Sequence, residues 1–459
     1  MHFSRFLLLL TAFLVISSLA FGQTPIPSNY DSLAQLIVRE ALGSNHSYTL
    51  LNDLVTNVGH RLSGSPGDAK AVAWAKITME RLGFANVRLE PVMVPKWVRG
   101  NVEEAFILHP DGKRENVKIA ALGGSISTPK EGVTAGVVEV KSFEELRSLG
   151  AATKGKIVFF NRPMDRMLMH TFAGYGGAVN QRGRGAVEAA YAGGVAALIR
   201  SMTTRLDDVP HTGGMGYADS VNKVPAAAVS TVGAERLSAL LKEGKNILLQ
   251  IKLSAQSHPD VESANVLGEL RGTEKPEEVI VIGGHLDSWD KGQGAHDDGA
   301  GCVHAIEALR ILKHLGLQPK RTIRAVMFAN EENGLRGGTA YAAQERPGEK
   351  HIAAIESDAG GFAPRAFGVS EPAYGKVLSW APFFRNVGID RIQRGGGGAD
   401  IGPLMRKGVP GIGLVPEGHR YFDYHHSESD TIDKVNEREL ALGSAAMALM
   451  AWLIAQEGL

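Results

Sequence analysis

Acidic and histidine side chains are concentrated in the segment GGHLDSWDKGQGAHDDGAG, which directly follows the apolar run EVIVI. Neutral imidazole and carboxylate are ligands that Zn²⁺ accepts, and so many carboxylates in one segment need positive charge nearby. We therefore interpret His285 and Asp297 as metal ligands, and Asp297 has two oxygens with which it could bridge two ions. Asp287 lies two residues beyond His285, and we expect its carboxylate to accept the other ring N–H of that histidine.

A second apolar run ends in adjacent acids, in the segment TIRAVMFANEENG. Neighbouring side chains at a strand end point in different directions, so one acid can bind metal while the other faces a substrate. A free carboxylate beside a metal-bound water can act as a general base. We assign Glu331 as the base and Glu332 as a metal ligand. The alternative is that the pair only favours the dipole at a helix N-terminus.

Two further motifs carry candidate ligands. Asp358 follows an apolar stretch in ESDAGG, where an isolated acid would be a turn residue, and only the other motifs make it a ligand candidate. The segment YFDYHHSESDT contains the adjacent residues His425 and His426, and we expect at most one of them to face the same metal. The residues alone leave open which one does.

These motifs follow predicted strands. From Glu278 onward, apolar strands alternate with helices, which is typical of an α/β fold with a mixed, largely parallel sheet flanked by helices. Because the carboxyl ends of strands form the sites of open α/β sheets, we expect the motifs to converge there. Apolar residues spaced three to four apart predict helices over residues 30–84, and the first strands follow between residues 86 and 122.

The composition excludes several classes of protein. The chain has 459 residues, of which 44% are apolar and 21% charged, so we expect a folded protein that is neither disordered nor a multi-span membrane protein. Its 49 basic residues balance its 49 acidic residues, which leaves no long-range field to attract nucleic acid, and we expect no nucleic-acid partner. The one cysteine, Cys302, cannot form an intrachain disulfide and is expected in the core.

The first residues, MHFSRFLLLLTAFLVISSLAFGQ, combine a basic residue, an apolar run and small residues before Gln23. This order is typical of a secretory signal. We therefore expect residues 1–22 to be removed, the mature protein to be secreted or periplasmic, and no membrane contact after signal removal. An uncleaved membrane anchor is the alternative, although the apolar run is short for a membrane span.

The motifs GHLDS, DDGAG, NEE, SDAG and HHSESDT occur in this order along the chain. Together they resemble the co-catalytic di-zinc exopeptidases, a family that includes secreted bacterial aminopeptidases and glutamate carboxypeptidases. The resemblance covers the whole mature chain. WDKGQGAHDDGAG, ESDAGG and GGGGADIGPL are most similar to the plasma glutamate carboxypeptidase subgroup, which acts on dipeptides.

The resemblance implies two zinc ions per chain and a role for each candidate residue. The residues that it makes zinc ligands are His285 and Asp358 for one ion, Glu332 and His426 for the other, and Asp297 as the bridge. It selects His426 over His425 because the family ligand precedes the pattern seen in SESDT. It also implies a non-proline cis peptide bond between Asp297 and Asp298.

The implied reaction is hydrolysis of dipeptides or short peptides by a hydroxide that two ions share, with Glu331 as the general base. Asp287 is a second candidate catalytic residue, and Asp400 and His425 are candidate substrate-binding residues. The partners expected are a small peptide substrate and a second copy of the chain in a homodimer.

The chain is expected to divide into several parts. After the signal, residues 23–122 form the first part of the catalytic domain and residues 258–459 the second. Residues 123–257 carry strands around a glycine-rich middle, and this insertion resembles the smaller protease-associated domain of secreted peptidases. We interpret the glycine-rich stretch AGYGGAVNQRGRG within it as a flexible loop, because it lacks the Gly-Lys-Ser/Thr ending of a phosphate-binding loop.

Three other functions remain open at this point. The protein could be an exopeptidase with aminopeptidase rather than carboxypeptidase or dipeptidase specificity. It could be an acyltransferase of the glutaminyl cyclase type, which has a similar layout but works with one zinc. It could also be a binding protein of the same fold without catalysis, although such a protein is expected to lack metal ligands that are present here.

Overall fold

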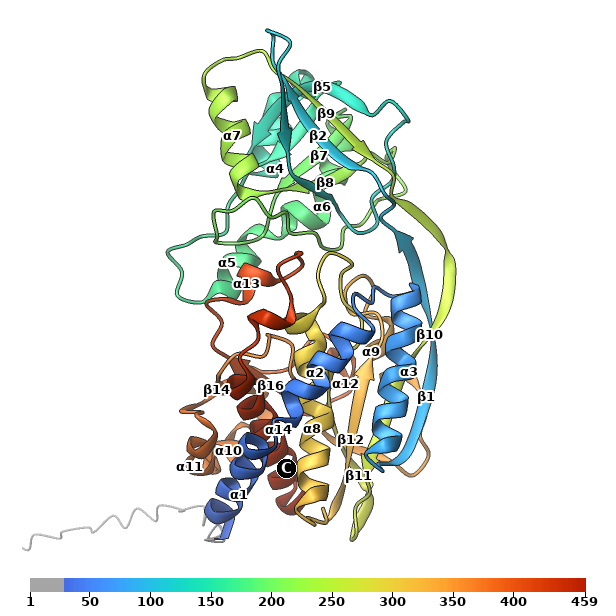
Figure 1. Cartoon of the computed structure of the whole chain (residues 1–459), viewed down its shortest axis with the longest axis vertical. Helices are drawn as coiled ribbons and strands as arrows, with labels where there is room; N and C mark the ends of the chain where they lie inside the picture. The colour runs from blue at the N-terminus through green and yellow to red at the C-terminus, as the bar shows by residue number, and fades with distance from the viewer. Residues whose placement is uncertain (1–28) are drawn as a thin grey trace, which may run out of the picture.

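The structure is a computed structural model that describes residues 29–459. The expected signal segment, residues 1–22, lies outside the described residues. The described chain forms two sheets at opposite ends of the molecule, each with helices packed on it (Figure 1). The mixed α/β class with sheets flanked by helices is therefore confirmed.

The first sheet has eight strands, and its central strands are parallel to one another. In spatial order its strands are β1 (Ala85–Val98), β10 (Gln256–Leu270), β12 (Arg321–Phe328), β11 (Lys275–His285), β13 (Lys350–Glu356), β16 (Gly411–Pro416), β14 (Pro364–Val369) and β15 (Arg391–Arg394). β12 is buried along its whole length, as expected of a central strand with both faces covered. The parallel strands β12, β11 and β13 all end at the same edge of the sheet.

Helices of several segments cover this sheet. They are α1 (Asn29–Ser44), α2 (His46–Asn57), α3 (Pro66–Arg81), α8 (Ala300–His314), α9 (Arg336–Ala343), α10 (Glu371–Ser379), α11 (Ala381–Phe384), α12 (Gly402–Arg406) and α14 (Glu437–Glu457). The short helix α13 (Tyr421–Tyr424) instead packs its buried residues against α5 (Thr171–Ala178) and the second sheet. Within residues 29–459, α14 is the one helix long and apolar enough to cross a membrane, and 83% of its apolar window is buried inside the protein. It packs against α8, whose Cys302 is buried in the core as expected.

The second sheet also has eight strands and lies at the upper end of Figure 1. Its spatial order is β3 (Arg114–Val117), β2 (Glu103–Leu108), β9 (Leu248–Leu253), β5 (Val133–Val140), β6 (Ile157–Phe160), β7 (Ala196–Arg200), β8 (Ala226–Val229) and β4 (Ile119–Ala121). Strands of this sheet begin at Glu103, whereas the sequence suggested a domain boundary at residue 123. The assignment as a protease-associated-like domain stays a prediction.

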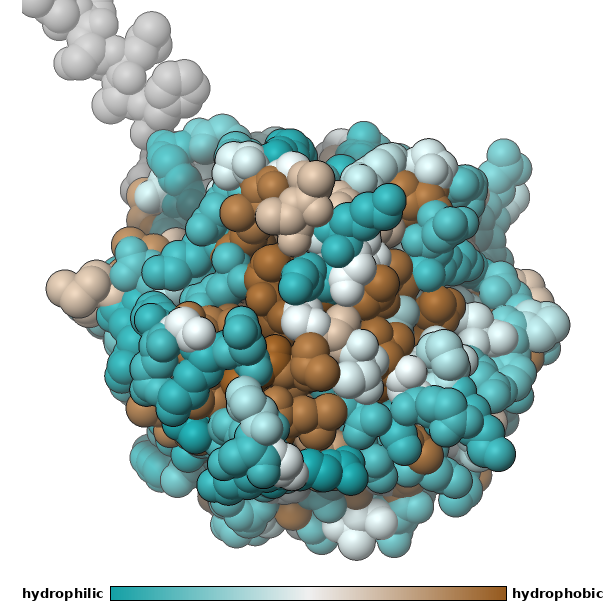
Figure 2. Space-filling view, turned by 90° about the horizontal axis from the view of Figure 1, so that it is seen from above, coloured by the Kyte–Doolittle hydropathy of each residue, from teal (hydrophilic) through white to brown (hydrophobic). Residues whose placement is uncertain are grey.

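Four helices belong to this second part of the chain. They are α4 (Phe143–Leu149), α5 (Thr171–Ala178), α6 (Asn180–Tyr191) and α7 (Thr231–Lys242). The long antiparallel strands β1 and β10 run side by side and lead from one sheet to the other (Figure 1). A view onto the end of the molecule that carries α7 and β5 shows apolar residues near its middle, with hydrophilic residues around them (Figure 2).

The glycine-rich stretch from Ala173 to Gly185 is helical, so the prediction of a flexible loop is wrong. Packing explains the difference, because tertiary contacts override the low helix propensity of glycine. A Cβ atom on Gly185 would lie 3.2 Å from the ring of Phe160 in the sheet, and glycine therefore lets α6 approach β6 closely. α5 and α6 place side chains beside the site described next.

Candidate metal centre

The predicted ligands lie at the ends of neighbouring elements. β11 ends at His285, and Asp297 lies in the turn Ala295–Gly299 that leads into α8. Glu331 and Glu332 follow β12, and Asp358 follows β13. His426 follows the short helix α13. Because the three strands are parallel neighbours, their carboxyl ends bring these side chains to one place.

Asp297 lies at the centre of the cluster. Its Oδ1 is 3.3 Å from Nε2 of His285, and that nitrogen is 3.5 Å from Oδ1 of Asp358. Its Oδ2 is 3.3 Å from Nε2 of His426, and that nitrogen is 2.9 Å from Oε2 of Glu332. The two oxygens of one carboxylate thus face two separate groups of metal-binding side chains, and His285, Asp297 and Asp358 form a group able to hold an ion.

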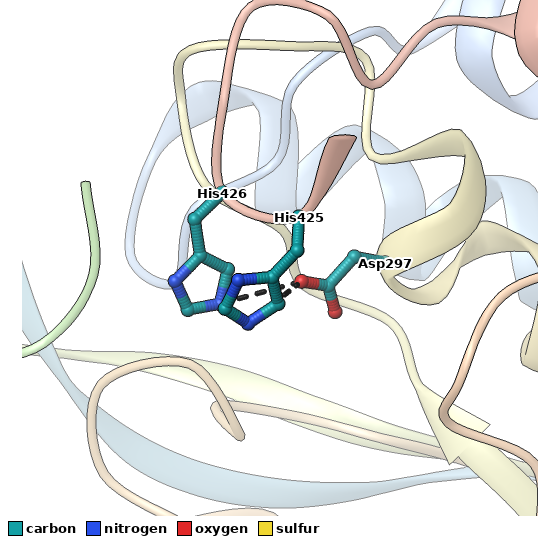
Figure 3. Close-up of side chains that lie close together, drawn as sticks. All are labelled: Asp297, His425 and His426. Carbon is teal, nitrogen blue, oxygen red and sulfur yellow. Dashed lines mark ion pairs between the residues drawn. The ribbon is translucent and has the colours of Figure 1, made fainter. Parts of the chain in front are cut away.

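His425 also lies beside Asp297 (Figure 3). Its ring is stacked on that of His426, with ring centres 3.5 Å apart. Nε2 of His425 is 3.8 Å from Oδ2 of Asp297, farther than Nε2 of His426, and Nδ1 has no hydrogen-bond partner among residues 29–459. His426 is therefore the better placed of the two, because it alone also contacts Glu332.

Several buried oxygen atoms of the cluster lack a hydrogen-bond donor within the described residues. They are Oδ2 of Asp297, Oε1 of Glu332 and Oδ1 of Asp358. Burial raises the pKa of the Glu332 carboxyl, and the nearby Asp297 acts in the same direction. Burial likewise raises the pKa of Asp358. Such a set of acids is stabilised as carboxylates by a cation, and divalent metal ions meet this need.

The carboxylate of Asp287 binds the main chain of the two neighbouring glutamates rather than the ring of His285. Nδ1 of His285 donates to the main-chain carbonyl of Asp287 at 2.9 Å, whereas the carboxylate of Asp287 is 3.7 Å away. The expected bond between this carboxylate and the ring is therefore not the one formed. The carboxylate instead accepts the main-chain N–H groups of Glu331 at 3.0 Å and Glu332 at 3.3 Å, and the hydroxyl of Ser63 at 2.9 Å.

The carboxylate binds there because the main-chain N–H groups just after β12 have no hydrogen-bond acceptor within the sheet. The N–H groups of Glu331 and Glu332 lie beyond the last ladder pair, so they need an acceptor from elsewhere. The carbonyl of Asp287 still binds Nδ1–H of His285, which leaves Nε2 free to face a metal. Asp287 is thus a positioning residue for both acids.

Replacing Asp287 by alanine should weaken the binding of a divalent metal about 10- to 100-fold, the usual effect of losing a group that orients metal ligands. The substitution removes the acceptor for the main-chain N–H groups of both Glu331 and Glu332. Competition with a chromogenic chelator measures the affinity. Ser63→Ala removes one of the bonds to Asp287 and should give a smaller loss, and unchanged affinity in Asp287→Ala would contradict this role.

Residues that the sequence analysis did not select also shape the cluster. The carboxylate of Asp430 accepts the main-chain N–H groups of His296 at 2.8 Å and Asp297 at 3.1 Å. The carboxylate of Asp298 accepts the N–H of His285 at 3.1 Å. The peptide bond between Asp297 and Asp298 is cis, as the resemblance implied. Asp298 and Asp430 lie within the motifs DDGAG and HHSESDT, and this position was the signal in the sequence that could have identified them.

The part of the chain with the second sheet contacts the loop that carries the two histidines. The N–H of Thr212 donates to the carbonyl of His426 at 2.9 Å, and Nδ1 of His211 donates to the carbonyl of His425 at 2.7 Å. Nη1 of Arg182 on α6 lies 3.4 Å from Nδ1 of His426. No motif in the sequence indicated these contacts, because they join segments more than two hundred residues apart.

A cavity of about 490 Å³ reaches the cluster at Asp358. Asp358 and Glu356 line it, and so do the four glycines of residues 395–398. Two residues from the part of the chain with the second sheet also line the cavity. They are Met169, just before α5, and Phe172, in the first turn of α5. The volume lies in the range of sites for small molecules.

Asp400, a candidate substrate-binding residue, is buried, and neither of its carboxylate oxygens has a hydrogen-bond partner among residues 29–459. Burial raises its pKa well above the ordinary value, and the nearby Glu356 acts in the same direction. Asp400 itself does not line the cavity. Its contribution to substrate binding stays a prediction.

Comparison with known proteins places the chain in a class. The model of peptidase family M28 matches residues 265–451, the part that carries all the predicted metal ligands. The chain belongs to peptidase family M28 and is a metallopeptidase.

Over nearly its whole length, the chain is similar to carboxypeptidase Q. It is 37% identical to that of Bos taurus over 434 residues, which are 93% of this chain and 90% of the bovine protein. It is 38% identical to that of Homo sapiens over 414 residues, which are 90% of this chain and 85% of the human protein. The resemblance seen in the sequence is thus confirmed.

Solved structures share the fold. The peptidase M28 precursor from Shewanella amazonensis SB2B is 37% identical, with a TM-score of 0.89 over 94% of this chain and 97% of that chain. A zinc aminopeptidase from Bacillus subtilis is 19% identical, with a TM-score of 0.65 over 90% of this chain and 96% of that chain. Because only 19% of residues are identical, the similarity to the Bacillus subtilis enzyme supports the fold alone.

Proposed function

We propose that the protein is a zinc-dependent exopeptidase that holds two zinc ions and hydrolyses dipeptides or short peptides. The observation that carries this proposal is the position of Asp297 between two histidines, with Oδ1 3.3 Å from His285 and Oδ2 3.3 Å from His426. A carboxylate in this position can bind one ion with each oxygen. The name of the bovine relative, carboxypeptidase Q, and the family support the same kind of reaction.

The residues present fit zinc. Imidazole nitrogen and carboxylate oxygen are the donors that Zn²⁺ accepts, and the cluster offers them from five side chains. The proposed ligands are His285 and Asp358 for one ion, Glu332 and His426 for the other, and Asp297 for both. The buried oxygens without hydrogen-bond donors among the described residues have lone pairs free to coordinate the ions. Bound zinc would polarise the scissile carbonyl and make water acidic enough to be deprotonated near neutral pH.

Glu331 would move the proton in this reaction. Its main-chain N–H is held by Asp287, and its side chain is free of ion pairs within residues 29–459. Burial raises the pKa of Glu331 to about 8, and neighbouring acids such as Asp358 act in the same direction. A carboxylate that binds no metal itself can take a proton from water during attack and return it to the leaving amine.

The substrate would enter through the 490 Å³ cavity that ends at Asp358. This size suits a dipeptide or the end of a short peptide, and a folded protein chain would not fit inside it. The proposed preference for small substrates therefore rests on the cavity as well as on the relatives. His425 and Asp400 are proposed to help bind the substrate.

Removal of metal should abolish activity reversibly. Treatment with a strong chelator is expected to take hydrolysis of a dipeptide such as Ala-Ala to background, and two equivalents of zinc should restore it, because the cluster supplies ligands for two ions. Elemental analysis of the purified protein gives the zinc count. Two zincs without cleavage of any peptide would overturn the proposal, and one zinc with cyclisation of N-terminal glutamine would favour the cyclase alternative.

Export and assembly are further parts of the proposal. The apolar segment after Arg5 supports export to the periplasm or the exterior, and mass spectrometry of the mature N-terminus tests cleavage before Gln23. The homodimer implied by the family resemblance is tested by analytical ultracentrifugation. A full-length, membrane-bound monomer would contradict both expectations.

A further inference from the structure

A second cavity, of about 750 Å³, lies between α4 and α6 in the part of the chain with the second sheet. The two helices contact each other, and they pack against the neighbouring strands β5 and β6 of that sheet (Figure 1). Gly150 after α4 and Gly193 after α6 also line this cavity. No residue lines both this cavity and the one at the metal centre, so the two are separate sites.

The side chains that line this cavity carry an excess of positive charge. Three cations, Arg147, Lys154 and Arg184, face one acid, Glu188. The carboxylate of Glu188 accepts from Nη2 of Arg147 at 3.0 Å and from Nη2 of Arg184 at 3.3 Å. One carboxylate neutralises only one of the two guanidinium groups, and Lys154 forms no ion pair within the described residues. Glu144 lies 3.9 Å from Arg147 in an exposed pair, which solvent screens.

Apolar groups stand beside these charges. Leu146, Ala151 and Ala192 line the cavity, and so does the aromatic side chain of Tyr191, which is 59% exposed. The hydroxyl of Tyr191 forms a hydrogen bond with that of Ser220 at 2.5 Å, which holds the ring in place. Tyrosine and arginine are enriched where proteins bind peptides and other proteins. The composition of this cavity is therefore that of a binding surface for a partially apolar anion.

We propose that the cavity between α4 and α6 binds an acidic peptide segment. Carboxylates of the peptide would pair with Arg147, Arg184 and Lys154, and an apolar side chain of the peptide would lie against Tyr191. Each arginine bonds Glu188 through one nitrogen, so its other N–H groups are free to bind a carboxylate of the peptide. A basic peptide would meet like charge in the same place.

The size of the cavity and its position agree with this occupant. The volume lies within the range of sites that enclose small ligands, which leaves room for a few residues of extended peptide. None of the proposed metal ligands lines it, so binding there does not need zinc. A segment bound between α4 and α6 would leave the cavity at the metal centre open, and the protein could hold an acidic partner and hydrolyse another peptide at the same time.

Calorimetric titration of the zinc-loaded protein tests the charge preference. The probe is acetyl-Leu-Asp-Glu-Leu-Asp-amide, whose blocked ends protect it from an exopeptidase. The controls are the same peptide with Asn and Gln in place of Asp and Glu, and acetyl-Leu-Lys-Lys-Leu-Lys-amide. We expect saturable binding of the acidic peptide below about 1 mM, at least about tenfold weaker binding of the amide peptide, and none of the lysine peptide. Raising the salt from about 50 mM to about 300 mM should weaken binding of the acidic peptide.

Substitutions place the peptide in the cavity. Arg147→Gln and Lys154→Gln should each weaken binding about two- to fivefold, and the double variant about 4- to 25-fold. Glu188 keeps Arg184 as its partner in these variants, and the melting temperature checks the fold. Arg391→Gln is the matched control, because it removes an exposed arginine that lines the cavity at the metal centre, and the affinity should not change.

Three results would overturn this inference. They are equal affinity for the acidic and amide peptides, wild-type affinity in the double variant, and loss of affinity in Arg391→Gln. Hydrolysis of Ala-Ala gives an independent measure, because saturating acidic peptide should leave KM unchanged, whereas competitive inhibition would place the peptide at the metal centre and contradict the proposal. If the zinc-loaded protein cleaved no peptide at all, the proposed function would fail, and the titrations would still decide this inference.

Discussion

Replacing Glu331 by glutamine should lower kcat/KM for dipeptides by about 10²- to 10⁴-fold, the range for loss of a general base. The amide cannot take a proton from water, whereas the shape of the side chain is preserved. The main-chain N–H of Glu331 is held by Asp287 in either case, so the neighbouring ligand Glu332 should keep its position. Steady-state kinetics on Ala-Ala measures the effect.

The zinc content separates a lost base from a lost metal site. Glu331→Gln should retain two zincs, because its side chain is in none of the ligand contacts around Asp297. Glu332→Gln is the control, and it should lose zinc together with activity because Oε2 of Glu332 lies 2.9 Å from Nε2 of His426. Full activity of zinc-loaded Glu331→Gln would remove this residue from catalysis.

Replacing Asp297 by alanine should have the largest effect on metal binding, because this one carboxylate contacts both histidine groups. We expect loss of both zincs and of all measurable peptidase activity. The loss of bound metal should also lower stability, by about 4 kcal/mol where free zinc stands at a thousand times its dissociation constant. Elemental analysis after dialysis and thermal unfolding with and without zinc measure these changes.

The matched control removes a carboxylate elsewhere. Asp219→Ala deletes an exposed acid in the part of the chain with the second sheet and should leave zinc content and melting temperature unchanged. If Asp297→Ala kept two zincs, the carboxylate would not be shared and the site would have to be reassigned. If it kept one, a single ion would be held without the bridge.

The sequence predicted the strands β11, β12, β13 and β16 of the first sheet and the polar residues that follow three of them, because each signal is local, but it did not indicate β10, β14 or β15. An apolar run followed at once by His285, by Glu331 and Glu332, or by Asp358 places the polar residues at a strand end. The parallel strands β12, β11 and β13 then bring them together. The glycine-rich stretch was mistaken for a loop because the phenyl ring of Phe160, against which Gly185 packs, is not near it in the sequence.

By itself, the sequence determined which residue types stand at the strand ends, and therefore that a metal-binding cluster could form there. Only the tertiary structure decided the partners of each side chain. The carboxylate of Asp287 accepts the main-chain N–H groups after β12 rather than the ring N–H of His285. Glu356 lines a cavity and has no cationic side chain as its partner among the described residues. Hydrogen bonds and burial depend on atoms brought together from distant segments, and periodicity and spacing do not encode them.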